Sequence, residues 1–205
     1  MTDEQVRKKR RGQIQAILLM LVVALPMLAA YVIYHTGWGM PTGTVNKGAL
    51  LEPARHLPDI QPRLADDSAW DISAEKKRWR YVIPGFSTCD EQCMKNLYLT
   101  RQVHIRLNDK ADRVERIYLL QDETLSPELS AHIEQEHPLL RVMRVQASSL
   151  DTLLEDTNLS GDAVAAGRYF LMDQDGFLMM AYSPQHTGGE LLKDVKKMLK
   201  TSYEE

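Results

Sequence analysis

The sequence predicts an α/β fold, a mixed central sheet flanked by helices, together with one transmembrane helix near the N-terminus. Three observations support this prediction. A long apolar segment lies near the N-terminus, strand-like and helix-like segments alternate later in the chain, and two cysteines follow the first of these strands. We divide the chain into a basic N-terminus (1–13), a transmembrane helix (14–34), a linker (35–75) and an α/β domain (76–205).

The apolar segment, residues 14–34, reads IQAILLMLVVALPMLAAYVIY and carries no charge. At about 1.5 Å per residue, a helix of this length spans roughly 30 Å, the thickness of a bilayer core. A cleaved signal peptide is the alternative, but its apolar region is normally shorter and ends at a small-x-small site. This segment continues into YVIYHTGWG, so we expect an uncleaved anchor.

Charge predicts the orientation of this anchor. The basic run RKKRR, Arg7 to Arg11, precedes it, and Lys47 is the first lysine or arginine after it. Because cytoplasmic flanks carry an excess of Lys and Arg, we expect a cytoplasmic N-terminus. In a Gram-negative bacterium the anchor then lies in the inner membrane and the domain in the periplasm. The formal net charge of −3 argues against nucleic acid as a partner.

The linker is predicted because glycine and proline recur over residues 35–75 and no periodicity persists there. The domain then begins with a strand, RWRYVIPG (78–85), which a Pro-Gly pair stops. Apolar residues at helical spacing follow over 89–107. RVERIYLLQD (113–122) is the second strand, and a Ser-Pro start predicts a helix over 125–137.

The remaining elements complete the alternation. LLRVMRVQA (139–147) is a third strand, and 150–158 is a short helix. A hairpin covers 168–184, with an Asp-Gly turn, and an amphipathic helix covers 188–200. A closing hairpin and terminal helix, with cysteines after the first strand, is the arrangement of the thioredoxin-like fold. We therefore expect a thioredoxin-like domain.

The two cysteines, Cys89 and Cys93, lie in the segment PGFSTCDEQCMKN. Four residues apart at the start of a helix, they fall on one face and within the span of a disulfide. A helix N-terminus stabilises a thiolate, and thiolates also suit Cu(I). A passive disulfide, a redox pair and part of a copper site all remain open from the residues alone.

The segment GFSTCDEQCMKNLYLTRQV resembles the Cys-x-x-x-Cys segment of Sco-type (SCO/SenC) proteins, although Met94 replaces the proline that usually follows the second cysteine. These are membrane-anchored, thioredoxin-like copper chaperones of cytochrome c oxidase assembly. The resemblance extends over NKGALLEPAR (46–55), RWRYVIPGF (78–86), YLLQDETLSPE (118–128) and YFLMDQDGFLMMAY (169–182).

The sequence departs from the Sco pattern at the third copper ligand. Sco-type proteins place a histidine shortly before the closing hairpin, and the matching segment here is SGDAVAAGRYFLMD, with the position at or near Ala165. The proline of thioredoxin-type reductases is absent too, because Gly167 and Arg168 stand there. His186, in SPQHTGG, is the histidine we consider as a replacement.

The resemblance implies an accessory factor of cytochrome c oxidase assembly. Cys89 would attack and Cys93 resolve, so that the pair acts as a thiol-disulfide oxidoreductase on the cysteines of the oxidase copper centre or of a copper chaperone. Any bound copper would be Cu(I), held by the thiolates of Cys89 and Cys93. The alternative is a non-catalytic scaffold of the same fold that binds an oxidase assembly partner and keeps a static disulfide.

Overall fold

The computed structural model describes residues 3–37 and 46–202. The chain divides into two compact units, Met1–Val45 and Asn46–Glu205. Part of the predicted linker, residues 38–45, lies outside the described residues, as do the first two residues of the predicted basic N-terminus.

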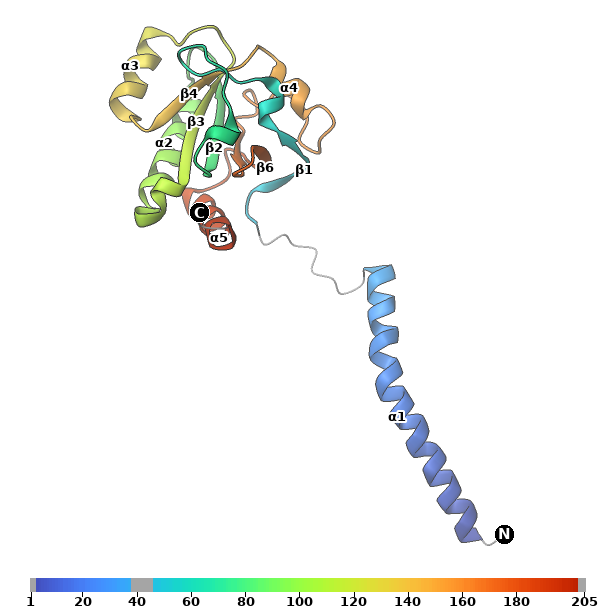
Figure 1. Cartoon of the computed structure of the whole chain (residues 1–205). Helices are drawn as coiled ribbons and strands as arrows, with labels where there is room; N and C mark the ends of the chain where they lie inside the picture. The colour runs from blue at the N-terminus through green and yellow to red at the C-terminus, as the bar shows by residue number, and fades with distance from the viewer. Residues whose placement is uncertain (1–2, 38–45, 203–205) are drawn as a thin grey trace. The chain divides into compact units, whose positions relative to one another are not determined.

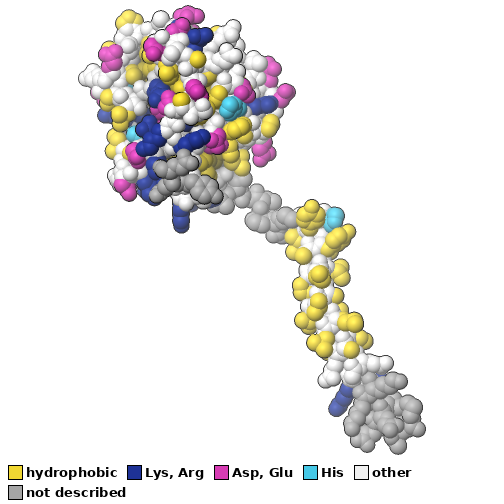
Figure 2. Space-filling model, in the orientation of Figure 1, with side chains coloured by type: hydrophobic (Ala, Val, Ile, Leu, Met, Phe, Trp, Pro, Cys, Tyr) yellow, Lys and Arg dark blue, Asp and Glu magenta, His cyan; other side chains and the backbone are white. Residues whose placement is uncertain are grey.

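The first unit contains one long helix, α1 (Asp3–Thr36), which includes Pro26. An 18-residue window within its segment Arg10–Thr36 has a mean hydropathy of 2.7 and no buried residues. Figure 2 shows apolar side chains along the visible face of this helix. By length and composition α1 is a candidate membrane span, in agreement with the span predicted over residues 14–34.

The second unit alternates strands and helices (Figure 1). Within the described residues the order is β1 (Ala49–His56), η1 (Leu57–Ile60), η2 (Ile72–Ala74), β2 (Trp79–Gly85), α2 (Glu91–Ile105), η3 (Asn108–Arg113), β3 (Val114–Leu120), α3 (Pro127–Glu136), β4 (Leu140–Arg144), α4 (Ser149–Leu154), β5 (Tyr169–Met172), β6 (Phe177–Tyr182) and α5 (Gly188–Thr201). Every strand and helix predicted between residues 78 and 200 is present, with ends that differ by a few residues.

The strands form one mixed sheet in the order β1-β6-β5-β2-β3-β4. β2, β3 and β4 are parallel, whereas β5 pairs antiparallel with β2, β6 with β5, and β1 with β6. The predicted α/β class with a mixed sheet is therefore confirmed. The carboxyl ends of β2, β3 and β4 meet at one edge of the sheet, where ligands of open α/β sheets bind.

Helices cover both faces of the sheet (Figure 1). On one face, α2, α3 and α5 share a core with β2 and β3 that includes Leu97, Leu129, Leu191, Tyr81 and Tyr118. On the other face, η1 and α4 share a second core with the same strands that includes Leu57, Leu154, Val82, Ile117 and Leu119. Side chains alternate between the two faces along each strand, which gives the sheet its two cores.

The segment predicted as linker, residues 35–75, contains a strand in its described part. β1, Ala49–His56, is an edge strand that pairs with β6, and the register shifts between Leu50 and Arg55. The strand contains Pro53, and its side chains are mostly exposed or half-buried. An irregular edge strand of this kind lacks the apolar alternation that identifies a strand in a sequence.

A buried carboxylate fixes the chain where it enters the domain. Asp194, on α5, is 1% exposed. Its carboxylate accepts the backbone N–H groups of Lys47 at 2.9 and 3.0 Å and of Gly48 at 2.9 Å, together with the Tyr182 hydroxyl at 3.2 Å. Three donors satisfy this buried charge, as burial requires. The domain therefore begins near residue 47.

A second polar cluster lies between β3, α2 and α3. Arg116 and His137 are 2% and 3% exposed, and Arg116 Nη1 lies 3.4 Å from His137 Nδ1. Burial, followed by the Arg116 charge, lowers the pKa of His137 to about 4. Burial also lowers the pKa of His104, whose ring bonds the Ala111 and Val114 carbonyls. Both imidazoles are therefore neutral at pH 7.

We expect the domain to lose stability on mild acidification. Between the folded pKa of His137 and the unfolded value of about 6.5, the unfolded chain binds more protons, so stability falls as the pH drops through this range. His137 should contribute a loss of about 1–2 kcal/mol between pH 7 and pH 5, measured by urea unfolding. His137→Gln, which keeps an acceptor for Arg116, should flatten this dependence; an unchanged pH dependence would contradict the assignment.

Candidate functional site

The cysteine segment joins the end of β2 to the start of α2. β2 ends at Gly85 and α2 begins at Glu91, with Asp90 as the N-cap residue. The Asp90 carboxylate accepts the Cys93 backbone N–H at 2.8 Å. The helix therefore starts two residues later than the predicted Cys89, because the Asp90 side chain satisfies a free N–H of its first turn. Cys89 precedes the cap and Cys93 lies in the first turn.

The two cysteines form a disulfide, with their Cα atoms 5.3 Å apart. Their surroundings differ. Cys89 is half-buried, whereas Cys93 is 8% exposed and belongs to the core beneath α2. An incoming sulfur atom therefore has easier access to Cys89 than to Cys93.

Tyr118, on β3, supports the buried sulfur. Its hydroxyl lies 3.9 Å from Cys93 Sγ and donates a hydrogen bond to the Phe86 carbonyl at 2.8 Å. The ring lies directly on Gly85, so that a Cβ there would collide with the hydroxyl and the ring. Position 85 therefore requires glycine, because any side chain would displace Tyr118.

The phenol of Tyr118 stays protonated. Burial first, and then the charges of Asp122 and Asp90, raise the pKa of Tyr118 well above its ordinary value. The single hydroxyl proton is donated to the Phe86 carbonyl, so the oxygen presents lone pairs toward Cys93. When the disulfide is reduced, this oxygen can accept a hydrogen bond from the Cys93 thiol.

The loop before β5 lies against the same helix. Asn96, on α2, donates from Nδ2 to the Gly167 carbonyl at 3.1 Å and accepts at Oδ1 from Gln92 Nε2 at 2.9 Å. Gly167 has φ +60°, and a Cβ there would press on Gln92 and Pro184. Glycine thus allows the loop to approach α2 closely.

This loop is where the resemblance implied a third copper ligand. Ala165 is exposed, and its backbone N–H bonds the Asp162 side chain at 2.9 Å. His186 does not replace the missing histidine: its Nδ1 accepts the Ser183 N–H at 3.0 Å and its Nε2 donates to the Lys47 carbonyl at 2.9 Å. Within residues 3–37 and 46–202, no three His, Cys, Asp or Glu side chains group as a metal site.

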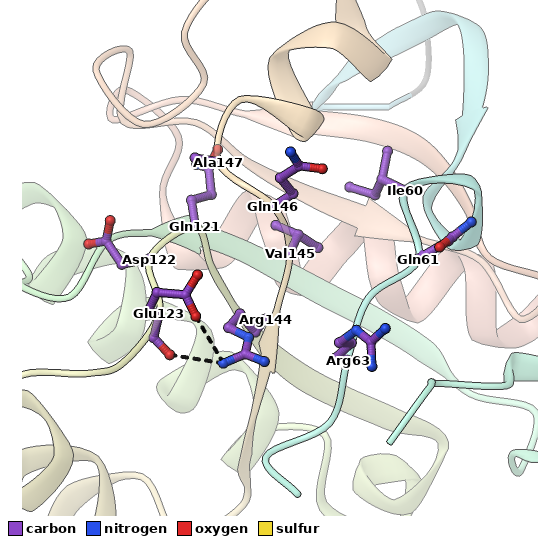
Figure 3. Close-up of a pocket in the computed structure, with 10 residues that line it drawn as sticks. All are labelled: Ile60, Gln61, Arg63, Gln121, Asp122, Glu123, Arg144, Val145, Gln146 and Ala147. Carbon is purple, nitrogen blue, oxygen red and sulfur yellow. Dashed lines mark hydrogen bonds and ion pairs between the residues drawn. The ribbon is translucent and has the colours of Figure 1, made fainter. Parts of the chain in front are cut away.

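A cavity that the sequence analysis missed opens at the carboxyl ends of β3 and β4 (Figure 3). Its volume is about 520 Å³, and its lining includes Gln61, Arg63, Gln121, Asp122 and Gln146. The predicted order of strands could have indicated it, because the loops that follow parallel strands lie together at one edge of a sheet. Residues 60–63 could not be placed there without β1 and η1.

Comparisons with solved structures agree with this architecture. Copper-bound yeast Sco1 matches with a TM-score of 0.55 and 12% identity over 78% of this chain and 97% of its own. Apo Sco1 from Thermus thermophilus matches with a TM-score of 0.52 and 15% identity over 77% and 99%. BsSco, described as a Sco family member with a disulfide switch, gives a TM-score of 0.53 and 12% identity over 77% and 99%. At these identities the likeness establishes the fold, and it confirms the predicted resemblance to Sco-type proteins at that level.

No curated protein sequence matches the chain. Two family descriptions do. Residues 6–37 match a transmembrane-like N-terminal domain, which supports a single-pass membrane anchor. Residues 79–202, more than half of the chain, match a transmembrane-like, thioredoxin-like C-terminal domain, so the chain belongs to the transmembrane-like, thioredoxin-like family.

Proposed function

We propose that this protein is a membrane-anchored thiol-disulfide exchange factor of cytochrome c oxidase assembly, acting through Cys89 and Cys93. The observation that carries the proposal is the unequal burial of the two cysteines at the start of α2. Cys89 is half-buried and Cys93 is 8% exposed. An exchanging pair needs one sulfur that a partner can reach and a second that is held beside it.

The exchange has two steps. The Cys89 thiolate attacks a sulfur of the partner's disulfide, which forms a mixed disulfide and releases one partner thiolate. Cys93 then loses its proton and attacks Cys89 Sγ, which forms the Cys89–Cys93 bond and releases the second partner thiolate. One dithiol is oxidised and one disulfide is reduced, and relative reduction potentials set the direction.

The role in cytochrome c oxidase assembly is proposed because the fold is similar to that of BsSco. BsSco is described as belonging to a family of cytochrome c oxidase assembly proteins and as having a disulfide switch. The same fold with a cysteine pair supports a similar role for this chain. Its partner would be the copper-site cysteines of the oxidase or of a copper chaperone.

Copper itself fits the site only in part. Yeast Sco1 is known with copper bound. In this chain, reduced Cys89 and Cys93 offer two soft ligands that suit Cu(I). The loop at Ala165 adds no ligating side chain, and both nitrogens of His186 are engaged. We therefore propose Cu(I) as cargo of the two thiolates and no site for Cu(II).

The membrane location follows from α1 and its flanking charge. The basic run from Arg7 to Arg11 precedes the apolar segment of the helix. With this run in the cytoplasm, the domain lies on the far side of the bacterial inner membrane, in the oxidising periplasm.

We expect the two cysteine variants to behave differently toward the small disulfide dithiobis(nitrobenzoate). Reduced Cys93→Ser should keep a stable mixed disulfide at Cys89 and release one thionitrobenzoate per protein. Reduced wild type should release two and close its own disulfide. Cys89→Ser should react about ten-fold more slowly than Cys93→Ser, because Cys93 is buried.

Equal rates for the two variants would contradict these assigned roles. If neither variant reacts, the pair is static, and the non-catalytic scaffold that binds an oxidase assembly partner becomes the better account.

Replacing Tyr118 should lower the reduction potential. Tyr118→Phe removes the acceptor for the Cys93 thiol, which destabilises the reduced form by about 0.5–1 kcal/mol and lowers the potential by roughly 10–20 mV. Equilibration in glutathione buffers measures this shift. Tyr98→Phe, at an exposed position on α2, is the matched control. A higher potential in Tyr118→Phe would refute the proposed orientation of the hydroxyl.

Metal titration of the reduced protein should separate the two oxidation states of copper. Cu(I) should bind with one equivalent and be lost in both Cys89→Ser and Cys93→Ser. Cu(II) should bind weakly, since two thiolates without an imidazole leave its coordination incomplete. Tight, stoichiometric Cu(II) binding would show that the site has a further ligand.

A further inference from the structure

A polar groove continues from the cavity at the carboxyl ends of β3 and β4. A second cavity of about 690 Å³ adjoins the first, and both are lined by Ile60, Gln61, Gln146 and Ala147. Asp122 lies at the β3 end of this groove and Arg55 at the other. Figure 3 shows Gln146, Gln61 and Arg63 around the first cavity.

The groove contains amide groups that the rest of the described chain leaves unpaired. Gln121 is 4% exposed and lines the first cavity, yet its side chain forms no hydrogen bond within residues 3–37 and 46–202. The side chains of Gln61 and Gln146, which are exposed, also lack partners among those residues. The amide atoms of Gln121 are not among the buried unpaired atoms of the described residues, so they reach the space of the cavity, where a ligand that offers both a donor and an acceptor can pair with them.

The charges in the groove exclude a simple anion site at the glutamine end. Arg144 Nη1 lies 3.4 Å from the Glu123 carboxylate, and its Nη2 pairs with Asp67. At the far end, Arg55 forms no ion pair within the described residues, and its Nε is buried without a partner. Asp59 and Asp156 line the same cavity, so a backbone carbonyl, which carries no charge, is the acceptor that suits Arg55.

The near end of the groove adjoins the cysteine loop. Asp122 lines the first cavity and accepts the Ser87 backbone N–H at 2.5 Å. Ser87 is two residues before Cys89, so their Cα atoms are separated by about 7 Å at most. The cysteine segment is therefore bonded to a residue of the groove, although it lines neither cavity itself.

We propose that this groove binds an extended segment of the partner polypeptide, next to the cysteine that exchanges with Cys89. The backbone N–H and C=O of the segment pair with the Gln121 amide, with Gln61 and Gln146 along its length. Arg55 donates to a backbone carbonyl of the segment at the other end. Because the groove recognises the backbone, binding tolerates different peptide sequences. The role of the groove in disulfide exchange rests on the proposed function.

The test uses a peptide of about ten residues, roughly 33 Å when extended. Its central residue is serine for binding, or cysteine linked to thionitrobenzoate for exchange. With the full-length protein, Gln121→Leu and Arg55→Met should each weaken serine-peptide binding and raise the exchange KM by about three- to ten-fold. Their rates with dithiobis(nitrobenzoate) and their reduction potentials should equal those of wild type.

Two controls test whether the effects are specific to the groove and to the peptide backbone. Gln102→Leu, on α2 away from the groove, should leave binding and KM unchanged. A peptide with prolines around the central serine lacks backbone donors and should bind more weakly.

Undetectable binding of the serine peptide, or equal binding by wild type and Gln121→Leu, would overturn the groove proposal. Peptide binding without any exchange would leave the groove intact and refute the proposed redox function instead.

Discussion

The packing of the Tyr118 ring on Gly85 is the contact on which the dithiol site depends. It fixes the end of β2, directs the Phe86 carbonyl toward the hydroxyl and places that oxygen beside Cys93. A side chain at residue 85 would therefore displace the ring that lies beside Cys93. The exposure of Cys89 follows, because the chain must leave β2 before Asp90 caps the helix.

Two polar contacts fix other segments of the domain. Asn96 ties α2 to the loop before β5, and Asp194 ties α5 to the point where the chain enters the domain. The loop that resembles the ligand-bearing loop of Sco-type proteins thus has a packing role here. Gly167 approaches the helix closely, while Ala165 leaves no ligand for a metal. Yeast Sco1, which has a similar fold, is known with copper bound.

Much of the fold could be predicted from the sequence, because buried parallel strands give short apolar runs that turn residues end, and amphipathic helices repeat their apolar residues at helical spacing. The strand over 78–85 and the helix over 188–200 are examples. β1 could not be predicted, since it is an irregular edge strand that contains Pro53. The cysteine pair was evident from its spacing, but the roles of Tyr118 and Asp194 depend on contacts between segments distant in sequence.

The cavity and the oxidation state of the cysteine pair also depend on contacts that the sequence does not reveal. Gln121 reads in the sequence as an ordinary polar residue after a strand, and its burial without a partner emerges only from the fold. The residues alone left a passive disulfide, a redox pair and part of a copper site open for Cys89 and Cys93. The disulfide in the structure is compatible with both an exchanging pair and a static one. The reduction potential of the pair distinguishes an exchanging disulfide from a static one.

The reduction potential of the Cys89–Cys93 couple in the full-length protein tests the central claim most directly. Structural disulfides of secreted proteins typically lie below about −300 mV, whereas exchanging pairs lie higher. An exchange factor with one accessible sulfur should have a potential above this value, and equilibration with dithiothreitol and glutathione buffers would measure it. A potential well below about −300 mV would contradict an exchange role and identify Cys89–Cys93 as a structural disulfide.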